Sequence, residues 1–208
     1  MYSEVEQIVY LVDDDADVRE GVSALLQSVG LKVVALSSTV EFLAHKGSQG
    51  PSCLILDVRL PGLSGLDFQT ELAKTQNDIP IIFITGHGDI PMTVKAIKAG
   101  AVEFLTKPFR DQDLLDAVRF ALERDRAGRE LQMQLQSLRS RYDSLSDRER
   151  QVMSLVCAGL MNKQVAAEIG VSEVTVKVHR HNLMKKLDAT SFAELVRMAD
   201  VLRIPRGK

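Results

Sequence analysis

The sequence predicts a doubly wound α/β domain with a five-stranded parallel sheet, followed by a small all-α domain that contains a helix-turn-helix. Three observations carry this prediction. Short apolar runs alternate with amphipathic segments over roughly the first 120 residues. Four short helical segments follow residue 144. The charge also divides there: residues 1–143 carry 15 basic and 21 acidic side chains, a balance of −6, whereas residues 144–208 carry 11 and 7, a balance of +4. A length of 208 residues suits this two-domain organisation.

The five predicted strands are short apolar runs rich in Val, Ile and Leu, at residues 8–12, 32–36, 53–56, 81–84 and 102–105. Because the runs are apolar on both faces, they suit a parallel sheet covered by helices on both sides. The intervening segments near 16–28, 38–46, 64–76, 90–99 and from 111 onward supply those helices. Gly30 and Gly100 stand where a helix ends in the left-handed conformation, and Ser38 with Glu41 has capping-box spacing.

Polar side chains follow several of these predicted strands. They are Asp13, Asp14 and Asp15 after the first strand, Asp57 after the third, Thr85 after the fourth and Lys107 after the fifth. Parallel strands end at one edge of the sheet, where ligands of such folds bind. Clustered carboxylates repel one another unless a cation intervenes, and hard oxygen ligands suit Mg²⁺. The sequence therefore predicts a magnesium site at this edge.

Other ligands fit this edge less well. A dinucleotide or flavin site needs a Gly-rich or hydroxyl-rich phosphate loop after the first strand, and the acidic segment 13–17 would repel a phosphate. No P-loop spacing occurs, and the four histidines form no zinc-ligand pattern with cysteine. Cys53 and Cys157 each lie in an apolar run, which predicts buried free thiols.

In this order and at these strand ends, the residues resemble the receiver domain of two-component response regulators over residues 6–124. The matching pieces are Asp13-Asp14, Asp57 before Val58-Arg59-Leu60-Pro61, Thr85-Gly86 and Lys107-Pro108. The segments 60–65 and 85–89 are similar to the FixJ-type branch. The resemblance implies a flavodoxin-like receiver at residues 1–124. A cis peptide is expected at Lys107-Pro108, since X-Pro bonds take this form at low cost.

The resemblance also assigns roles. Asp57 is the expected phospho-acceptor, and Mg²⁺ is held by Asp14, Asp57 and the backbone carbonyl of Arg59, with Asp13 acting through water. Lys107 contacts the phosphoryl oxygens, the Thr85 hydroxyl moves to bind the phosphoryl group, and Gly86 leaves space beside it. Phe104 matches an aromatic switch position, and ordinary core packing remains its alternative. His87 either affects dephosphorylation or is an exposed loop residue.

A helical linker is predicted at residues 125–143. From Asp111 to Tyr142 there is no proline and one glycine, Gly128, which is the expected point of any break. Leu131, Leu135, Leu138, Tyr142 and Leu145 recur at heptad spacing. This seam either joins two copies of the chain or packs against one of the domains.

Residues 144–208 read as four helices. Ser146 with Glu149 and Ser191 with Glu194 have capping-box spacing, and two short helices flank Gly170, as in a helix-turn-helix. In the third helix, near 173–187, one stripe is apolar and packs inward, with His179 and Arg180 beside it; His179 is mainly structural. The opposite stripe mixes valines with basic and amide groups, a surface suited to a DNA major groove. Its members are Val174, Lys177, Val178, His181, Asn182 and Lys185.

This tail resembles the LuxR-type helix-turn-helix, on Leu145-Ser146-Asp147-Arg148-Glu149, residues 159–163, Val165-Ala166, residues 175–180 and Lys186-Leu187. The resemblance implies base contacts from Lys177, Val178 and His181. It places Lys163, Thr175, Arg180 and Lys185 nearer the DNA backbone. His181 and Met161 depart from the residues usual in the family, which leaves the base preference open.

Together the two resemblances imply a transcription regulator of the NarL/FixJ type. It would be a cytoplasmic phosphoprotein rather than an enzyme, phosphorylated by a sensor histidine kinase, homodimeric when phosphorylated and bound to promoter DNA. RNA polymerase is a further candidate partner. The chain is also similar to regulators of aromatic-hydrocarbon catabolism, such as the styrene-degradation branch. Two rivals remain: a phosphatase of the haloacid-dehalogenase type, which would want an acid where Arg59 stands, and a receiver-like scaffold whose DNA binding does not depend on phosphorylation. Neither a membrane helix nor a signal peptide is predicted.

Overall fold

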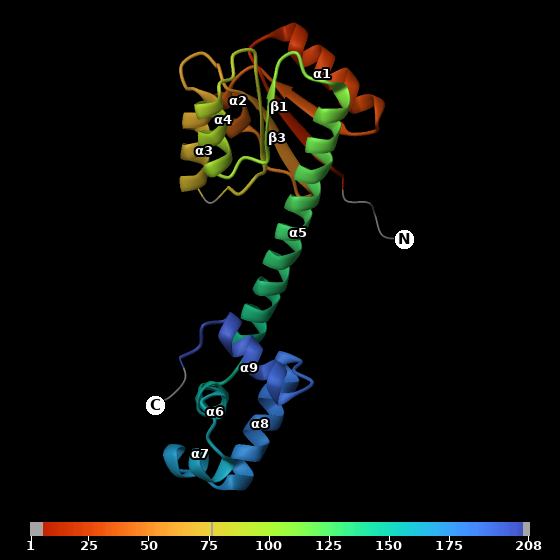
Figure 1. The fold of residues 1–208 in the computed structure, drawn as a ribbon. Helices are drawn as coiled ribbons and strands as arrows, with labels where there is room; N and C mark the ends of the chain where they lie inside the picture. The colour runs from red at the N-terminus through yellow and green to blue at the C-terminus, as the bar shows by residue number, and fades with distance from the viewer. Residues whose placement is uncertain (1–5, 76, 206–208) are drawn as a thin grey trace. The chain divides into compact units, whose positions relative to one another are not determined.

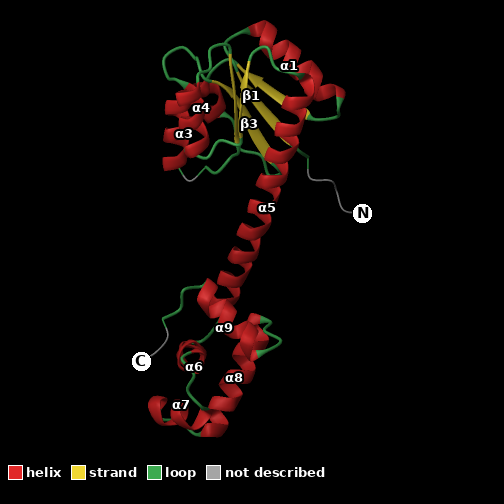
Figure 2. Cartoon of the chain, in the orientation of Figure 1, coloured by secondary structure: helices red, strands yellow, loops and turns green. Residues whose placement is uncertain are grey.

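The computed structural model describes residues 6–75 and 77–205. The chain divides into two compact units, Met1–Glu130 and Leu131–Lys208. The first is an α/β sandwich and the second is built of helices, as Figures 1 and 2 show. Within the described ranges, no helix is long and apolar enough to cross a membrane.

A five-stranded sheet forms the centre of the first unit. Its strands are β1 (Ile8–Val12), β2 (Lys32–Leu36), β3 (Ser52–Asp57), β4 (Ile81–Thr85) and β5 (Glu103–Thr106). They lie in the order β2-β1-β3-β4-β5, and every pairing is parallel. The predicted fold class is therefore confirmed. The third strand is longer at both ends than predicted, and the fifth begins and ends one residue later.

Helices cover both faces of the sheet (Figure 2). On one face, α1 (Ala16–Ser28) and the first part of α5 (Asp111–Asp143) pack on inward side chains of β1, β3 and β4. On the other, α2 (Thr39–Ala44), α3 (Gly65–Lys74) and α4 (Ile90–Lys98) enclose a core containing Phe42, Phe68 and Phe83. Both sheet faces are thus buried, which explains why the central strands are apolar throughout.

Helix ends largely follow the sequence signals. Gly30 and Gly100 take positive φ angles of 83° and 97°, as expected after α1 and α4. Ser38 caps α2 by accepting from the Glu41 amide, but the Glu41 carboxylate binds Ser37 instead of closing a capping box on Ser38. Both oxygens of that carboxylate are occupied by the Ser37 amide and hydroxyl, so the reciprocal bond predicted there does not form.

Helix α5 runs without interruption through Gly128, the residue at which any break in the predicted helical linker was expected. Contacts on either side stabilise the helix there. The Arg129 Nε donates to Asp125 Oδ2 at 2.6 Å, and its Nη1 donates to the Ser48 carbonyl at 3.0 Å. The Ser52 amide donates to the same Asp125 oxygen at 2.8 Å. These bonds join α5 to the start of β3 and to the segment before it, next to the position where one glycine costs a helix about 1 kcal/mol.

The second unit packs four helices around one core, with α6 (Asp147–Cys157), α7 (Asn162–Ile169), α8 (Glu173–Leu187) and α9 (Phe192–Val201). Leu138 and Tyr142 from the end of α5 pack against this core, so that part of the heptad seam is used within the unit. Ser146 and Glu149 form the predicted capping box. Glu194 binds Thr190 rather than the Ser191 amide, so the second predicted box is incomplete. Both cysteines are buried free thiols, as predicted.

Candidate functional site

The candidate site lies at the carboxyl edge of the sheet. Asp57 is the last residue of β3 and Thr85 the last of β4, while Asp13 and Lys107 lie just beyond β1 and β5. The parallel register brings these ends together: Asp57 pairs with Ile84, and Thr85 pairs with Thr106. The structure therefore gathers residues that are up to 94 positions apart in the sequence.

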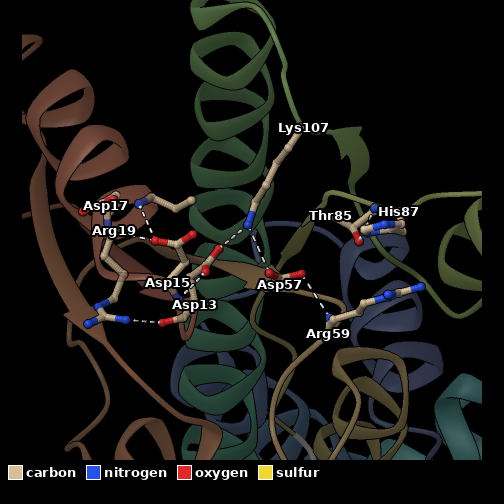
Figure 3. A network of polar contacts seen from close by, with 10 residues as sticks. Asp13, Asp15, Asp17, Arg19, Asp57, Arg59, Thr85, His87 and Lys107 are labelled. Atoms are coloured by element: carbon tan, nitrogen blue, oxygen red, sulfur yellow. Dashed lines mark hydrogen bonds and ion pairs between the residues drawn. The ribbon is translucent and has the colours of Figure 1, made fainter.

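Lys107 reaches between two aspartates (Figure 3). Its Nζ donates to Asp13 Oδ2 at 2.6 Å and to Asp57 Oδ2 at 3.0 Å. The Lys107-Pro108 peptide is cis, as expected, and the Lys107 amide donates to the Thr85 carbonyl at 2.7 Å. The other Asp57 oxygen, Oδ1, accepts from the Arg59 amide at 3.0 Å. One cation thus partly neutralises two buried carboxylates.

Burial and the contacts between the charged groups act in opposite directions on the pKa values of Asp13 and Lys107. Asp13 has no exposed surface, and desolvation raises the pKa of its carboxyl above the ordinary value although Lys107 pulls it down. Burial alone would lower the pKa of Lys107. Its hydrogen bonds and charge interactions with Asp13 and Asp57 outweigh that effect and raise it. The raised pKa keeps Lys107 positively charged between Asp13 and Asp57.

Three carboxylates offer oxygen atoms to one point. One oxygen from each of Asp13, Asp14 and Asp57 lies within 4.8 Å of the others, and Asp14 is exposed to solvent. All three are hard donors, and an exposed member leaves room for water, which Mg²⁺ tends to retain. This donor set fits Mg²⁺.

Thr85 and Phe104 lie beside the acidic cluster. Thr85 is fully buried, and its Oγ1 accepts from the His87 amide at 3.3 Å. Phe104 is buried against Phe83, with ring centroids 6.1 Å apart. A Cβ built on Gly88 would lie 2.8 Å from the Phe104 ring and 3.2 Å from the Thr85 methyl group, so the loop packs directly on this pair. Gly86 has open space around it.

Two further residues shape the site and were not predicted. Arg19 of α1 donates from Nη1 to the Asp13 carbonyl at 2.6 Å, which anchors the acidic loop (Figure 3). Gly65, at the start of α3, lies so close to the Asp57 carbonyl that a Cβ would collide with it. No local pattern in the sequence marks either contact, because both depend on how α1 and α3 pack against the ends of the strands.

The predicted DNA-facing stripe of α8 lies on the surface of the second unit. Val174 and Val178 are 69% and 52% exposed, whereas Val176, Leu183 and Leu187 are buried. Lys177, His181 and Lys185 are exposed, Asn182 and Thr175 are partly buried, and Lys163 is exposed on α7. Exposed valines between cations suit a groove that offers thymine methyl groups and phosphates. His179 is partly buried beside the core stripe.

Arg180 differs from the other predicted DNA contacts. Its Nη1 donates to Asn162 Oδ1 at 2.6 Å, and its guanidinium carbon lies 5.5 Å from the centroid of the Phe192 ring. The side chain therefore has partners within the protein, on α7 and α9.

Both parts of the chain match known protein families. Residues 9–119 match the family model described as the response regulator receiver domain, and residues 143–199 match that of bacterial regulatory proteins, luxR family. Nodulation protein W of Bradyrhizobium diazoefficiens is 59% identical over 197 residues, which cover 95% of this chain and 87% of that protein. The response regulator protein TmoT of Ectopseudomonas mendocina is 52% identical, covering 95% and 90%.

Solved structures of response regulators are also similar to this chain. The response regulator StyR is 48% identical and superposes with a TM-score of 0.84, covering 94% of this chain and 98% of that one. The predicted NarL/FixJ type is confirmed by these matches. The acidic edge of the sheet lies in the part that matches the receiver domain, and the exposed helix α8 lies in the part that matches the luxR family. The chain belongs to the two-component response regulators that combine a receiver domain with a LuxR-type helix-turn-helix domain.

Proposed function

We propose that Asp57 of this response regulator accepts a phosphoryl group from a sensor histidine kinase, and that this controls DNA binding by α8. The observation that carries the proposal is the position of Lys107, whose ammonium contacts the carboxylate of Asp57 beside Asp13. A carboxylate at the open end of a parallel sheet, with a cation in contact, is arranged to receive an anionic group.

In the transfer, an Asp57 oxygen forms a bond to phosphorus. The phosphorus–nitrogen bond of the phosphohistidine breaks, and its electron pair goes to the imidazole nitrogen. The incoming group carries negative charge into an already acidic site. Lys107 would contact its oxygens, and Thr85 would donate its hydroxyl hydrogen to one of them. Phosphoryl transfer depends chiefly on positioning and charge stabilisation of this kind.

Asp14 and Asp57 would hold Mg²⁺ together with the Arg59 carbonyl, and Asp13 would act through water. The donor set described above supports this assignment. When bound, the metal supplies positive charge against the phosphoryl oxygens.

Reorientation of Thr85 would alter its packing with the loop at Gly88 and with Phe104, next to α4. Such a local change can bias a two-state surface toward dimerisation. A dimer would present two copies of α8 to a palindromic promoter site, with RNA polymerase as a further partner on the DNA. Base contacts would come from Lys177, Val178 and His181. Nearer the DNA backbone would lie Lys163, Thr175 and Lys185, and Asn182 belongs to the same DNA-facing stripe.

Intact mass after incubation with acetyl phosphate and Mg²⁺ tests the acceptor. The wild type is expected to gain one phosphoryl group, Asp57→Asn none, and Asp78→Asn the same as the wild type, because Asp78 lies before β4 at the opposite end of the sheet. Binding to a DNA site obtained by selection from random sequences is expected to tighten for the phosphorylated wild type only. A gain that persists in Asp57→Asn, or DNA binding indifferent to phosphorylation, would contradict the proposal.

A further inference from the structure

The basic residues of α8 fall into two sets. Lys177 and Lys185 are exposed, and within the described part of the chain neither side chain has a hydrogen-bond or ion-pair partner. Lys186 instead donates to Glu149 at 2.7 Å, and Arg180 donates to Asn162 at 2.6 Å. Lys186 and Arg180 thus have polar partners within the protein, and of these two only Arg180 is partly buried.

Arg180 links three helices through one planar group. An edge nitrogen donates to Asn162, the first residue of α7, while its guanidinium stacks near the ring of Phe192, the first residue of α9. A guanidinium can do both at once because its donors lie in the plane and its face is free to stack. A lysine ammonium at this position could make one of the two contacts but not both.

The contact with Asn162 bears on the neighbouring cation. Lys163 follows directly on α7 and is exposed. Its reach toward DNA depends on where the first turn of α7 lies relative to α8. The bond between Arg180 and Asn162 joins the two helices of the helix-turn-helix at that turn.

We infer that Arg180 is a positioning residue for DNA binding: it touches no phosphate itself, and it holds the first turn of α7 so that Lys163 can. This inference rests on the proposed DNA-binding function. The inference differs from the family-based expectation that Arg180 lies against the DNA backbone. The Arg180 guanidinium already donates to Asn162 through one nitrogen and lies over the ring of Phe192.

The salt dependence of DNA binding by the full-length protein tests the inference, on a duplex obtained by site selection. Each lost phosphate contact reduces the slope of log K against log salt by about 0.9. Lys163→Met is expected to lose this increment per subunit. Arg180→Met is expected to lose the same increment, and the double variant no more than either alone. Arg180→Lys should behave like Arg180→Met, and so should Asn162→Ala, which removes only the partner. Arg197→Met removes an exposed cation of α9 and should leave the slope unchanged.

Additive losses, with Arg180→Lys close to wild type, would mean that Arg180 contacts phosphate directly and would overturn the inference. It would also be overturned if Arg180→Met lowered only the melting temperature, with the slope and the Lys163 increment intact. Failure of the proposed function looks different: the wild type would show no preference for any selected duplex, or Lys177→Met would bind as the wild type does.

Discussion

Replacing Asp13 by Asn is expected to stabilise the receiver domain when Mg²⁺ is absent. Asp13 is completely buried, and its raised pKa reflects the cost of holding its charge away from water. Asparagine has nearly the same shape and keeps an oxygen that can accept from Lys107. The substitution therefore removes a buried charge without opening a cavity.

The magnitude follows from the geometry. At an effective dielectric constant of about 20, two charges 4.8 Å apart, the outer limit for these carboxylates, repel by about 3.5 kcal/mol. Two such repulsions together, about 7 kcal/mol, slightly exceed the attraction of about 6 kcal/mol to Lys107 at 2.6 Å. Desolvation of the carboxylate then decides the sign. Because the remaining hydrogen bonds offset part of that cost, we expect a net gain of about 1–2 kcal/mol.

Magnesium should reverse the comparison. A bound ion at 100 times its dissociation constant stabilises the wild type by about 2.7 kcal/mol, and Asp13→Asn should lose most of this response. Calorimetry of the full chain in EDTA and in a Mg²⁺ titration measures both effects, at roughly 4 °C per kcal/mol for a domain of this size. Hydrogen exchange in β1 and β3 identifies the receiver transition. Asp78→Asn changes the net charge equally and should shift neither value.

Two outcomes would refute this reasoning. If Asp13→Asn melts at a lower temperature than the wild type in EDTA, then the ion pair with Lys107 outweighs desolvation. If the variant responds to Mg²⁺ as strongly as the wild type, then Asp13 takes no part in holding the ion.

Three other predictions concern packing, pH and the long helix. Gly88→Ala should destabilise the receiver by about 1–3 kcal/mol in urea titrations, because the added methyl group meets the Phe104 ring. Gly86→Ala has open space and should cost far less. Glu149 is buried against Lys186, and although burial opposes it, the hydrogen bonds lower its pKa in the folded state. The stabilisation from Glu149 is therefore present above its ordinary pKa and is lost as pH falls through the lowered value. In Glu149→Gln, the melting temperature of the second unit should depend less on pH below about pH 4.5 than in the wild type. Arg129→Met should speed hydrogen exchange of residues 123–129 in α5 by roughly tenfold, since it loses the ion pair and the bonds to the loop before β3; unchanged exchange there would show that helix packing alone holds the segment.

Much of the receiver could be predicted from local patterns. Strands apolar on both faces have a characteristic length, and a parallel sheet brings the residues after each strand to one edge. Asp13, Asp57 and Lys107 could therefore be expected to lie together. In the structure the Lys107 Nζ lies within 3.0 Å of a carboxylate oxygen of each aspartate. The ends of parallel strands meet at one edge whatever their side chains are. Recognising each strand in a short sequence window is therefore enough to predict which residues come together.

The remainder depends on contacts between distant elements. The need for glycine at Gly65 and Gly88 arises from neighbours that lie on other strands. Arg180 borders two stripes of its helix, and its partners Asn162 and Phe192 meet it only after three helices have packed. Gly128 lowers helix propensity locally, yet the helix continues through it. The neighbouring Arg129 bonds to Ser48 and Ser52, which lie before and at the start of β3.

The contacts made along α5 also indicate where this protein could be recombined with its relatives. Residues up to Arg129 are fastened to the receiver, and residues from Leu138 onward belong to the core of the DNA-binding unit. Between them, residues 130–134 are all exposed to solvent. A chimera joined within that stretch would inherit two intact cores, whereas a joint at residue 124 or 143 would separate a helix from contacts that its own domain needs.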